Sequence, residues 1–331
     1  MYFIIGISLV FAYLLSINWA VSLISAAIWQ LIERRADDWR ADTRAGVIFA
    51  LRVMPMTIAV VTIVALILPA YVMYEPTSSG ETIGWKMAVV VAVAAAGLIA
   101  ALGRIVASWW RTKRLRGEWE SRSTRIDLDG VDIPVYKLRH PYPVIAVVGT
   151  FQPKVFLAED LLTDLEPTEL AASIAHELGH IASRDNLKRL VMRVCGDLLV
   201  FRFGTSLDRA WSESAEVAAD EYAAETGGRT VALELASALI KIGRATPDQA
   251  AWATPLGSFL IGGRRSSLKH RIERLLKLSE TNCGGQGHRP GTLLVGVLGS
   301  AIILAVAVAP LFSQTLLSVH DLTESLFAML N

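Results

Sequence analysis

The residues of this chain whose types and spacing could do chemistry lie in one stretch, 169–185, which reads ELAASIAHELGHIASRD. Its centre is an H-E-x-x-H pattern formed by His176, Glu177 and His180. On a helix, side chains four residues apart share one face, so both imidazoles can bind one Zn²⁺ while Glu177 lies beside them to accept a proton from water. The spacing therefore predicts a hydrolytic zinc site, with His176 and His180 as ligands and Glu177 as the catalytic base.

The residues around this pattern favour a helix. Pro167 suits a first helical position, and Glu169 places negative charge in the first turn, where the helix dipole favours it. Apolar residues at helical spacing predict one buried stripe: Leu170, Ile174, Leu178 and Ile181. The alternative is a chance match on an ordinary amphipathic helix, and carboxylates further along the chain count against it.

A second stretch, 211–225, contains these carboxylates. It reads WSESAEVAADEYAAE, which is rich in Ala and Glu and predicts a helix. A catalytic zinc with two His ligands usually has one more protein ligand and an open position for water, and Glu216 is the candidate. Asp220, one turn later on the same face, could accept the free N–H of a liganding imidazole and fix its tautomer. Alternative carboxylates, for which a solvated helix face is the simpler interpretation, are Glu213, Glu221 and Glu225. For Asp185, either a contact with the zinc site or a capping role fits the sequence, and we favour a structural role.

Composition indicates a membrane protein. The 331 residues are 53% hydrophobic with a mean hydropathy of +0.44, which is too apolar for an ordinary soluble protein of this length. The formal net charge of +1 offers no electrostatic basis for binding nucleic acid. The two cysteines, Cys195 and Cys283, are too few for a disulfide framework and indicate reduced thiols.

Four stretches are long and apolar enough to span a bilayer: residues 1–32, 53–74, 85–110 and 291–312. The first has no basic region ahead of its apolar run and is too long for a secretory signal, so we expect a retained helix.

Basic residues predict the orientation of these spans. The loop 75–84 and the segment after Phe312 contain no Lys or Arg. Basic residues cluster after the first span and after the third: Arg34, Arg35, Arg40 and Arg44, then Arg111, Lys113, Arg114 and Arg116. Because positive residues favour the cytoplasmic side of the inner (plasma) membrane, we expect both termini outside and residues 111–290 in the cytosol.

Residues 111–290 are long enough for one compact domain. We expect a helix over 111–125, then a small antiparallel sheet from short strands within 126–138, 143–149 and 154–157. The sheet is either scaffold alone or also holds a peptide substrate as an added strand at an exposed edge. Further helices are expected at 185–203, 231–242 and 267–278.

Several segments together resemble the BlaR/MecR-type membrane metallopeptidases: GTFQPKVFLAEDLL, PTELAASIAHELGHIASRD, AWSESAEVAADEYAAE and LKHRIERLL. The resemblance covers about residues 131–276 and the layout of three spans before this domain and one after it. It implies a gluzincin-type fold in which His176, His180 and Glu216 hold Zn²⁺, Glu177 is the base, and Asp220 supports a ligand. Known members of that family cleave a cytosolic repressor in response to β-lactam antibiotics.

We expect the chain to depart from that family after Phe312, because residues 313–331 contain no S-x-x-K motif and a short tail is expected in place of the penicillin-binding sensor. The HtpX and CaaX-endopeptidase family shares the H-E-x-x-H and E-x-x-x-D patterns. Its HtpX members place two spans before the zinc motif and two after it, whereas three and one are expected here.

We therefore expect a mainly α membrane protein with four transmembrane helices. Residues 1–110 form three of them, 111–290 an α+β zinc peptidase domain, and 291–331 the fourth span with a short outer tail. The predicted function is a zinc endopeptidase that cleaves a protein or peptide at the cytosolic face in regulatory signalling. Its expected partners are the lipid bilayer and either a membrane sensor or further copies of the chain.

Two alternatives are an HtpX-like quality-control protease and a non-catalytic signalling subunit that retains the zinc fold. An intact Glu177 counts against the second, because a structural zinc site needs no general base and leaves no open position.

Overall fold

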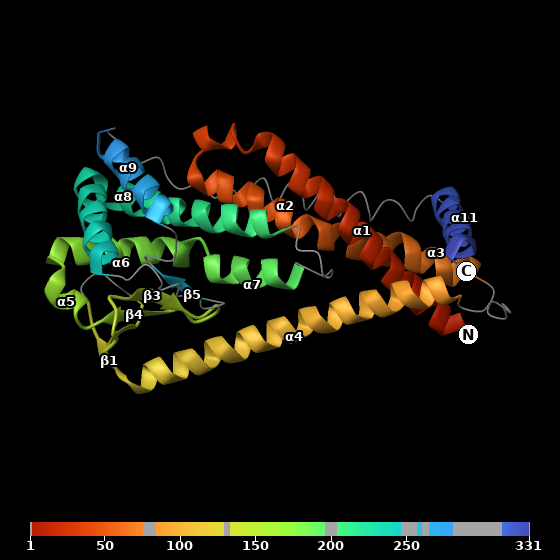
Figure 1. The fold of residues 1–331 in the computed structure, drawn as a ribbon, viewed down its shortest axis with the longest axis horizontal. Helices are drawn as coiled ribbons and strands as arrows, with labels where there is room; N and C mark the ends of the chain where they lie inside the picture. The colour runs from red at the N-terminus through yellow and green to blue at the C-terminus, as the bar shows by residue number, and fades with distance from the viewer. Residues whose placement is uncertain are drawn as a thin grey trace.

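Long helices and a smaller α+β domain share one elongated molecule, with the sheet at one end (Figure 1). The computed structural model describes residues 2–75, 84–128, 133–195, 204–245, 257–259, 265–280 and 313–330. The first helix begins, and the last described helix lies, at the end of the molecule away from the sheet (Figure 1).

Helices long and apolar enough to cross a membrane are Tyr2–Ile32, Ala41–Tyr74 and Trp85–Ser121. The first is α1 and the third is α4. The second comprises α2 (Ala41–Thr62), a π-helical turn (Ile63–Ile67) and α3 (Leu68–Tyr74). Only 11% of the most apolar window of α4 is buried, so most of its apolar surface needs a cover such as lipid. These helices agree with the first three expected spans, and the fourth, 291–312, lies outside the described residues.

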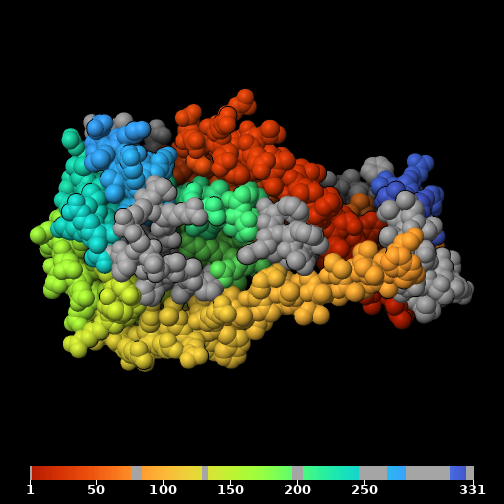
Figure 2. Space-filling model, in the orientation of Figure 1, coloured from red at the N-terminus to blue at the C-terminus, as the bar shows by residue number. Residues whose placement is uncertain are grey.

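The helix expected over 111–125 is not a separate element, because α4 runs unbroken for 37 residues. Ion pairs four residues apart continue it beyond the apolar part: Arg114 Nε lies 2.9 Å from Glu118, and Arg116 Nε lies 2.6 Å from Glu120. The helix thereby carries Trp119 into the core of the domain. In the space-filling view, α4 forms one edge of the molecule along its length (Figure 2).

The domain is built on a sheet with the strand order β1-β2-β4-β3-β5. The strands are β1 (Ser123–Ile126), β2 (Val135–Leu138), β3 (Ile145–Val148), β4 (Lys154–Ala158) and β5 (Gly257–Phe259). The expected antiparallel arrangement is wrong at one pair, since β2 and β4 are parallel. β3 and β4 form an antiparallel hairpin, and β4 is the strand of this hairpin that lies beside β2. The chain therefore reverses twice between β2 and β4, which makes these two strands parallel. β5 pairs with β3 and occupies its outer edge.

Helices cover this sheet, and β3 and β4 are therefore buried at nearly every position. One core joins the sheet to α6 (Pro167–Ala182), α8 (Thr205–Ala245) and α9 (Arg265–Glu280), and includes Phe156 and Leu239. The helices expected at 211–225 and 231–242 both form within α8, and the chain leaves helical geometry between them at Gly228, whose φ of 70° suits a residue without a side chain. The shorter helices are η1 (Ala36–Asp38), α5 (Leu161–Asp164) and α7 (Asp185–Cys195).

The last described helix, α11 (Ser313–Leu330), packs against the long helices at their end away from the sheet (Figure 1). The hydroxyls of Tyr13 and Thr323 lie 3.0 Å apart, and the rings of Tyr74 and His320 lie 5.8 Å apart. The segment expected as a short tail is thus a helix tied to α1 and α3.

Candidate metal centre

Helix α6 places the H-E-x-x-H residues inside the domain. The helix begins with Pro167, and Glu169 closes its first turn by accepting a hydrogen bond from the Glu166 backbone N–H at 2.9 Å. Glu169 also accepts bonds from Ser237 and Lys241 of α8, at 2.6 and 2.7 Å. This buried carboxylate fixes α6 against α8.

The two histidines of α6 face a carboxylate of α8. Nε2 of His176 lies 3.6 Å from Oε2 of Glu216, and Nε2 of His180 lies 3.6 Å from Oε1 of the same side chain. The helices approach closely because Gly179 has no side chain: a Cβ there would lie 3.1 Å from the Cα of Ala219. The structure thus brings together His176, His180 and Glu216, the ligand set that the sequence predicts.

This geometry fits a metal ion. One ligand atom from each of the three side chains lies within 4.8 Å of the others. Ligands at Zn–N and Zn–O distances near 2.1 Å in a tetrahedron lie ~3.4 Å apart, close to the nitrogen–oxygen separations here. Nε2 of His176 and of His180 are buried and have no hydrogen-bond partner among the described residues. Two buried, unpaired imidazole nitrogens facing a carboxylate are what a bound cation would satisfy.

Each histidine presents its other nitrogen to a second carboxylate. Nδ1 of His176 lies 2.8 Å from Asp220, and Nδ1 of His180 lies 2.7 Å from Asp185. Such contacts select the tautomer in which Nε2 carries the lone pair. Asp220 lies beside a proposed histidine ligand, as the sequence predicts. Asp185 also contacts such a histidine, so the purely structural role that the sequence favours for it does not account for this contact. Arg184, with a φ of 54°, turns the chain between α6 and α7 and so brings Asp185 beside His180.

Arg271 of α9 also lies at the site, where it makes contacts with two carboxylates that the sequence does not predict. Its guanidinium donates to both oxygens of Asp220, at 2.7 and 2.8 Å, and to Glu216 at 3.1 Å. It is only 4% exposed, so a charge that is costly to bury is matched here by two carboxylates. One signal in the sequence could have indicated this, because Arg271 occupies an apolar-stripe position between Leu268 and Leu275.

The site is arranged to attract positive charge. Burial alone would raise the pKa of Glu216, but His180, His176 and Arg271 lower it to about 2. Burial would lower the pKa of His176, but the facing carboxylates of Asp220 and Glu216 raise it to about 9. Positive charge between these carboxylates is therefore favoured, whether a proton or a metal ion supplies it.

Glu177 differs from the other acids of the site. Both of its oxygens are buried without a hydrogen-bond partner among the described residues, and burial raises its pKa to about 8. A carboxyl group with no structural partner beside a metal-ligand set has the freedom that a proton acceptor needs.

The alternative third ligands lie elsewhere. Glu221 accepts hydrogen bonds from Arg274 of α9 and from the backbone N–H of Ala41, and Glu225 binds Arg40 at 2.8 Å. Both therefore connect α8 to neighbouring elements. Glu213 is exposed on the surface of α8.

Residues 143–207 match the family model for peptidase family M48. The matched stretch is shorter than half of the chain and contains β3, β4, α5, α6 and α7, hence His176, Glu177, His180 and Asp185. The chain is similar to these metallopeptidases, which are generally zinc-dependent. The match supports a metallopeptidase of the membrane type. The matched residues do not include Glu216 or Arg271, and the match does not identify a BlaR/MecR subtype.

Proposed function

We propose that this protein is an integral membrane zinc endopeptidase that cleaves a protein substrate at the cytosolic face. One observation carries the proposal: His176, His180 and Glu216 converge as a ligand set. Glu177, whose oxygens have no hydrogen-bond partner within the described part of the chain, directly follows His176. A structural zinc site would be closed by a fourth protein ligand and would not need a general base.

The side chains of the site have separable roles. Zinc, when bound, would polarise the scissile carbonyl and lower the pKa of a water molecule. Glu177 would accept a proton from the attacking water and return it to the leaving amine. Asp220 and Asp185 hold the imidazoles of His176 and His180 in orientation.

Arg271 holds Asp220 with two hydrogen bonds and Glu216 with a third. It therefore keeps both carboxylates in place without itself taking part in proton transfer, because arginine stays protonated in proteins.

A cytosolic active site is supported by the contacts of the first basic loop. Arg40 lies 2.8 Å from Glu225, and Arg274 donates to the backbone carbonyl of Trp39, so this loop touches the peptidase domain. The basic loop and the domain thus lie on the same side of the long helices, while the start of α1 and the helix α11 lie at the other end (Figure 1). Positive-inside logic assigns the domain side to the cytosol.

This orientation can be tested by labelling from outside intact cells. Single cysteines replace Ser325 or Ser183 in a chain without Cys195 and Cys283. A membrane-impermeant maleimide should label Ser325→Cys and not Ser183→Cys, and both should react after lysis. Labelling of Ser183→Cys from outside would exclude a cytosolic active site.

The substrate assignment follows the BlaR/MecR resemblance: a cytosolic repressor, or the cytosolic flank of a membrane protein, cut in regulatory signalling. A membrane sensor or a second copy of the chain would then control cleavage. The HtpX-like alternative predicts many membrane-protein substrates and the non-catalytic alternative predicts none.

Proteomics of protein termini should compare cells that carry the wild type with cells that carry Glu177→Gln. We expect cytosolic-side cleavage products in the wild type alone. New termini confined to outer-face segments would contradict the proposal, and identical termini in both strains would favour the non-catalytic alternative.

A further inference from the structure

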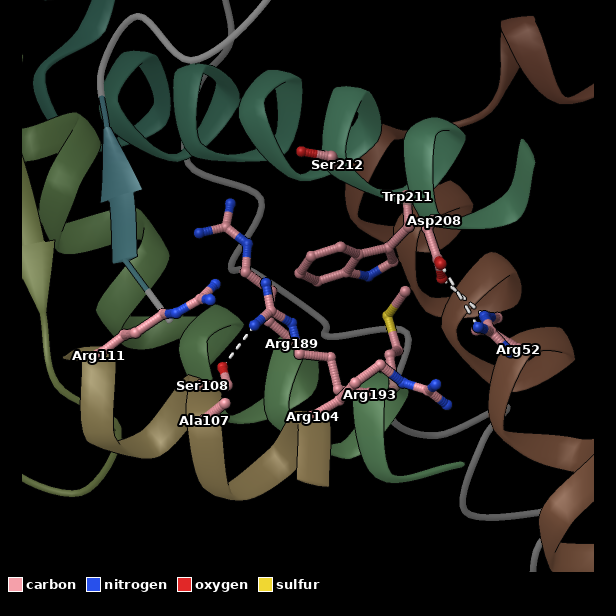
Figure 3. A pocket seen from close by; sticks show the side chains of 11 residues that line it. Arg52, Arg104, Ala107, Ser108, Arg111, Arg189, Arg193, Asp208, Trp211 and Ser212 are labelled. Carbon is pink, nitrogen blue, oxygen red and sulfur yellow. Dashed lines mark hydrogen bonds and ion pairs between the residues drawn. The ribbon is translucent and has the colours of Figure 1, made fainter. Parts of the chain in front are cut away.

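A cavity of about 540 Å³ lies where α2, α4, α7 and α8 meet (Figure 3), and none of the three proposed metal ligands lines it. It is lined by more basic residues than any site described above. Its charged lining residues are Arg52, Arg104, Arg111, Arg189, Arg193 and Asp208.

The positive charge of this arginine cavity exceeds its negative charge. Asp208 is the one carboxylate among the described lining residues, and Arg52 already binds it at 2.6 and 3.4 Å. Arg193 donates to the hydroxyl of Ser108, which carries no charge. Within the part of the chain that the structure describes, neither Arg111 nor Arg193 forms an ion pair with a carboxylate. Burial and the neighbouring Arg189 also lower the pKa of Arg193, as crowding of like charges does.

The lining is partly rigid. Arg52 is 5% exposed and lies against Gly204, where an added Cβ would come within 2.5 Å of its guanidinium carbon. The guanidinium of Arg189 stacks over the ring of Trp211 at 5.6 Å. Planar guanidinium groups held in fixed orientations are well suited to bind the oxygens of a phosphate.

The position of the cavity along the long helices indicates the source of such a phosphate. Arg52 directly precedes the apolar run that starts at Val53. On α4, exposed apolar residues continue to Val106, and the exposed Trp109 and Trp110 follow. Tryptophans mark the level of lipid headgroups, so the cavity lies at that level on the domain side.

We propose that the arginine cavity binds the phosphate group of an anionic phospholipid, with the headgroup among Arg111, Arg189 and Arg193 and the acyl chains along the apolar part of α4. Phosphate is the shared chemistry, and a free phosphate ion is the competing source. The membrane level of the site favours the lipid. The proposal does not depend on the peptidase activity.

The test is lipid retention by the full-length, delipidated protein in detergent, followed by native mass spectrometry during titration with phosphatidylglycerol or phosphatidylcholine. The wild type should retain one phosphatidylglycerol in preference to phosphatidylcholine. The Arg111→Gln/Arg193→Gln variant should bind phosphatidylglycerol at least about tenfold more weakly, because two charge-assisted contacts are lost. Arg189 is left unchanged because it also lies 3.9 Å from Glu216.

The matched control is Lys113→Gln. Lys113 lies on the same helix at nearly the same level and contacts the rings of Trp109 and Trp110, but it does not line the cavity. The Lys113→Gln variant should reduce lipid binding by less than about twofold, because the attraction between a single interfacial charge and the lipid is weak and screened by salt. An unchanged thermal unfolding temperature and zinc content would show that each variant is folded.

A further arm adds inorganic phosphate at millimolar concentration. Retention of phosphatidylglycerol under this competition supports the lipid assignment. Binding of phosphate without selective binding of phosphatidylglycerol would overturn it, as would equal lipid affinity of the wild type and the double variant, or an equal loss in Lys113→Gln.

Discussion

Helix α8 contributes residues to both the metal centre and the arginine cavity. Asp208 of the cavity lies about two turns before Glu216 of the metal centre. The charges of the two sites are opposite in sign and differ in how they are satisfied. At the metal centre, Asp220 and Glu216 are bound by Arg271. Glu216 also faces two imidazole nitrogens that have no hydrogen-bond partner among the described residues. In the arginine cavity, positive charge predominates, and the one described carboxylate is bound by Arg52.

This difference shows that the degree of burial decides how the charges of a site are balanced. The metal centre is enclosed, so its acids must be matched within the protein, and only a small cation completes them. The cavity is partly open: Arg111 is exposed there, and solvent or an outside anion can balance the positive charge. Loss of one charge should therefore have unequal consequences at the two sites.

The largest effect is expected from Glu177→Gln, which removes a proton acceptor and keeps the shape of the side chain. Cleavage should fall by ~10²–10⁴-fold, while bound zinc per chain stays at the wild-type level. A cleavage assay in membranes and elemental analysis of the purified protein measure the two quantities. His180→Ala should lose both, and undiminished cleavage by Glu177→Gln would remove the catalytic assignment.

Glu216→Gln should weaken zinc binding by more than ~100-fold, because a direct ligand counts for more than a supporting carboxylate. Its matched control is Glu213→Gln on the exposed face of α8, which should leave zinc affinity unchanged. Competition with a chelator of known affinity measures both. Full zinc binding by the Glu216 variant, with loss in the Glu213 variant, would move the third ligand to the other face of the helix.

Arg271→Gln tests the comparison of the two sites directly. It leaves Asp220 and Glu216 buried without their counter-charge and should destabilise the domain by ~3–5 kcal/mol. Arg111→Gln, in the exposed part of the arginine cavity, should change stability by less than ~0.5 kcal/mol. Denaturant unfolding in detergent, with zinc removed from both, gives the two values. Equal effects would show that enclosure does not distinguish the sites.

Among the residues of the metal centre, the smallest effects are expected from Asp220→Asn and Asp185→Asn. Each keeps the size of the side chain but weakens its bond to a histidine Nδ1, so zinc affinity should fall ~10–100-fold. Asp220 is also bound by Arg271, so its variant should lose at least as much zinc affinity as the Asp185 variant. No change in the Asp185 variant would return that residue to the purely structural role that the sequence favours.

Local patterns were enough to identify part of this molecule. The four-residue spacing of His176 and His180, and the helix that carries them, depend only on backbone periodicity. The long apolar runs agree with three helices of membrane-spanning length for the same reason. Glu216 and Asp220 could be selected because they share one face of a helix whose composition predicts it.

Other features depend on contacts between residues far apart in the chain. Arg271 reaches Asp220 across 51 residues, and the parallel pairing of β2 with β4 follows from where the β3–β4 hairpin docks. Asp185 meets His180 only because the backbone reverses at Arg184. The arginine cavity combines side chains from four helices. Charges of this kind look like solvated surface residues in the sequence, since nothing local encodes which ones packing will bury together.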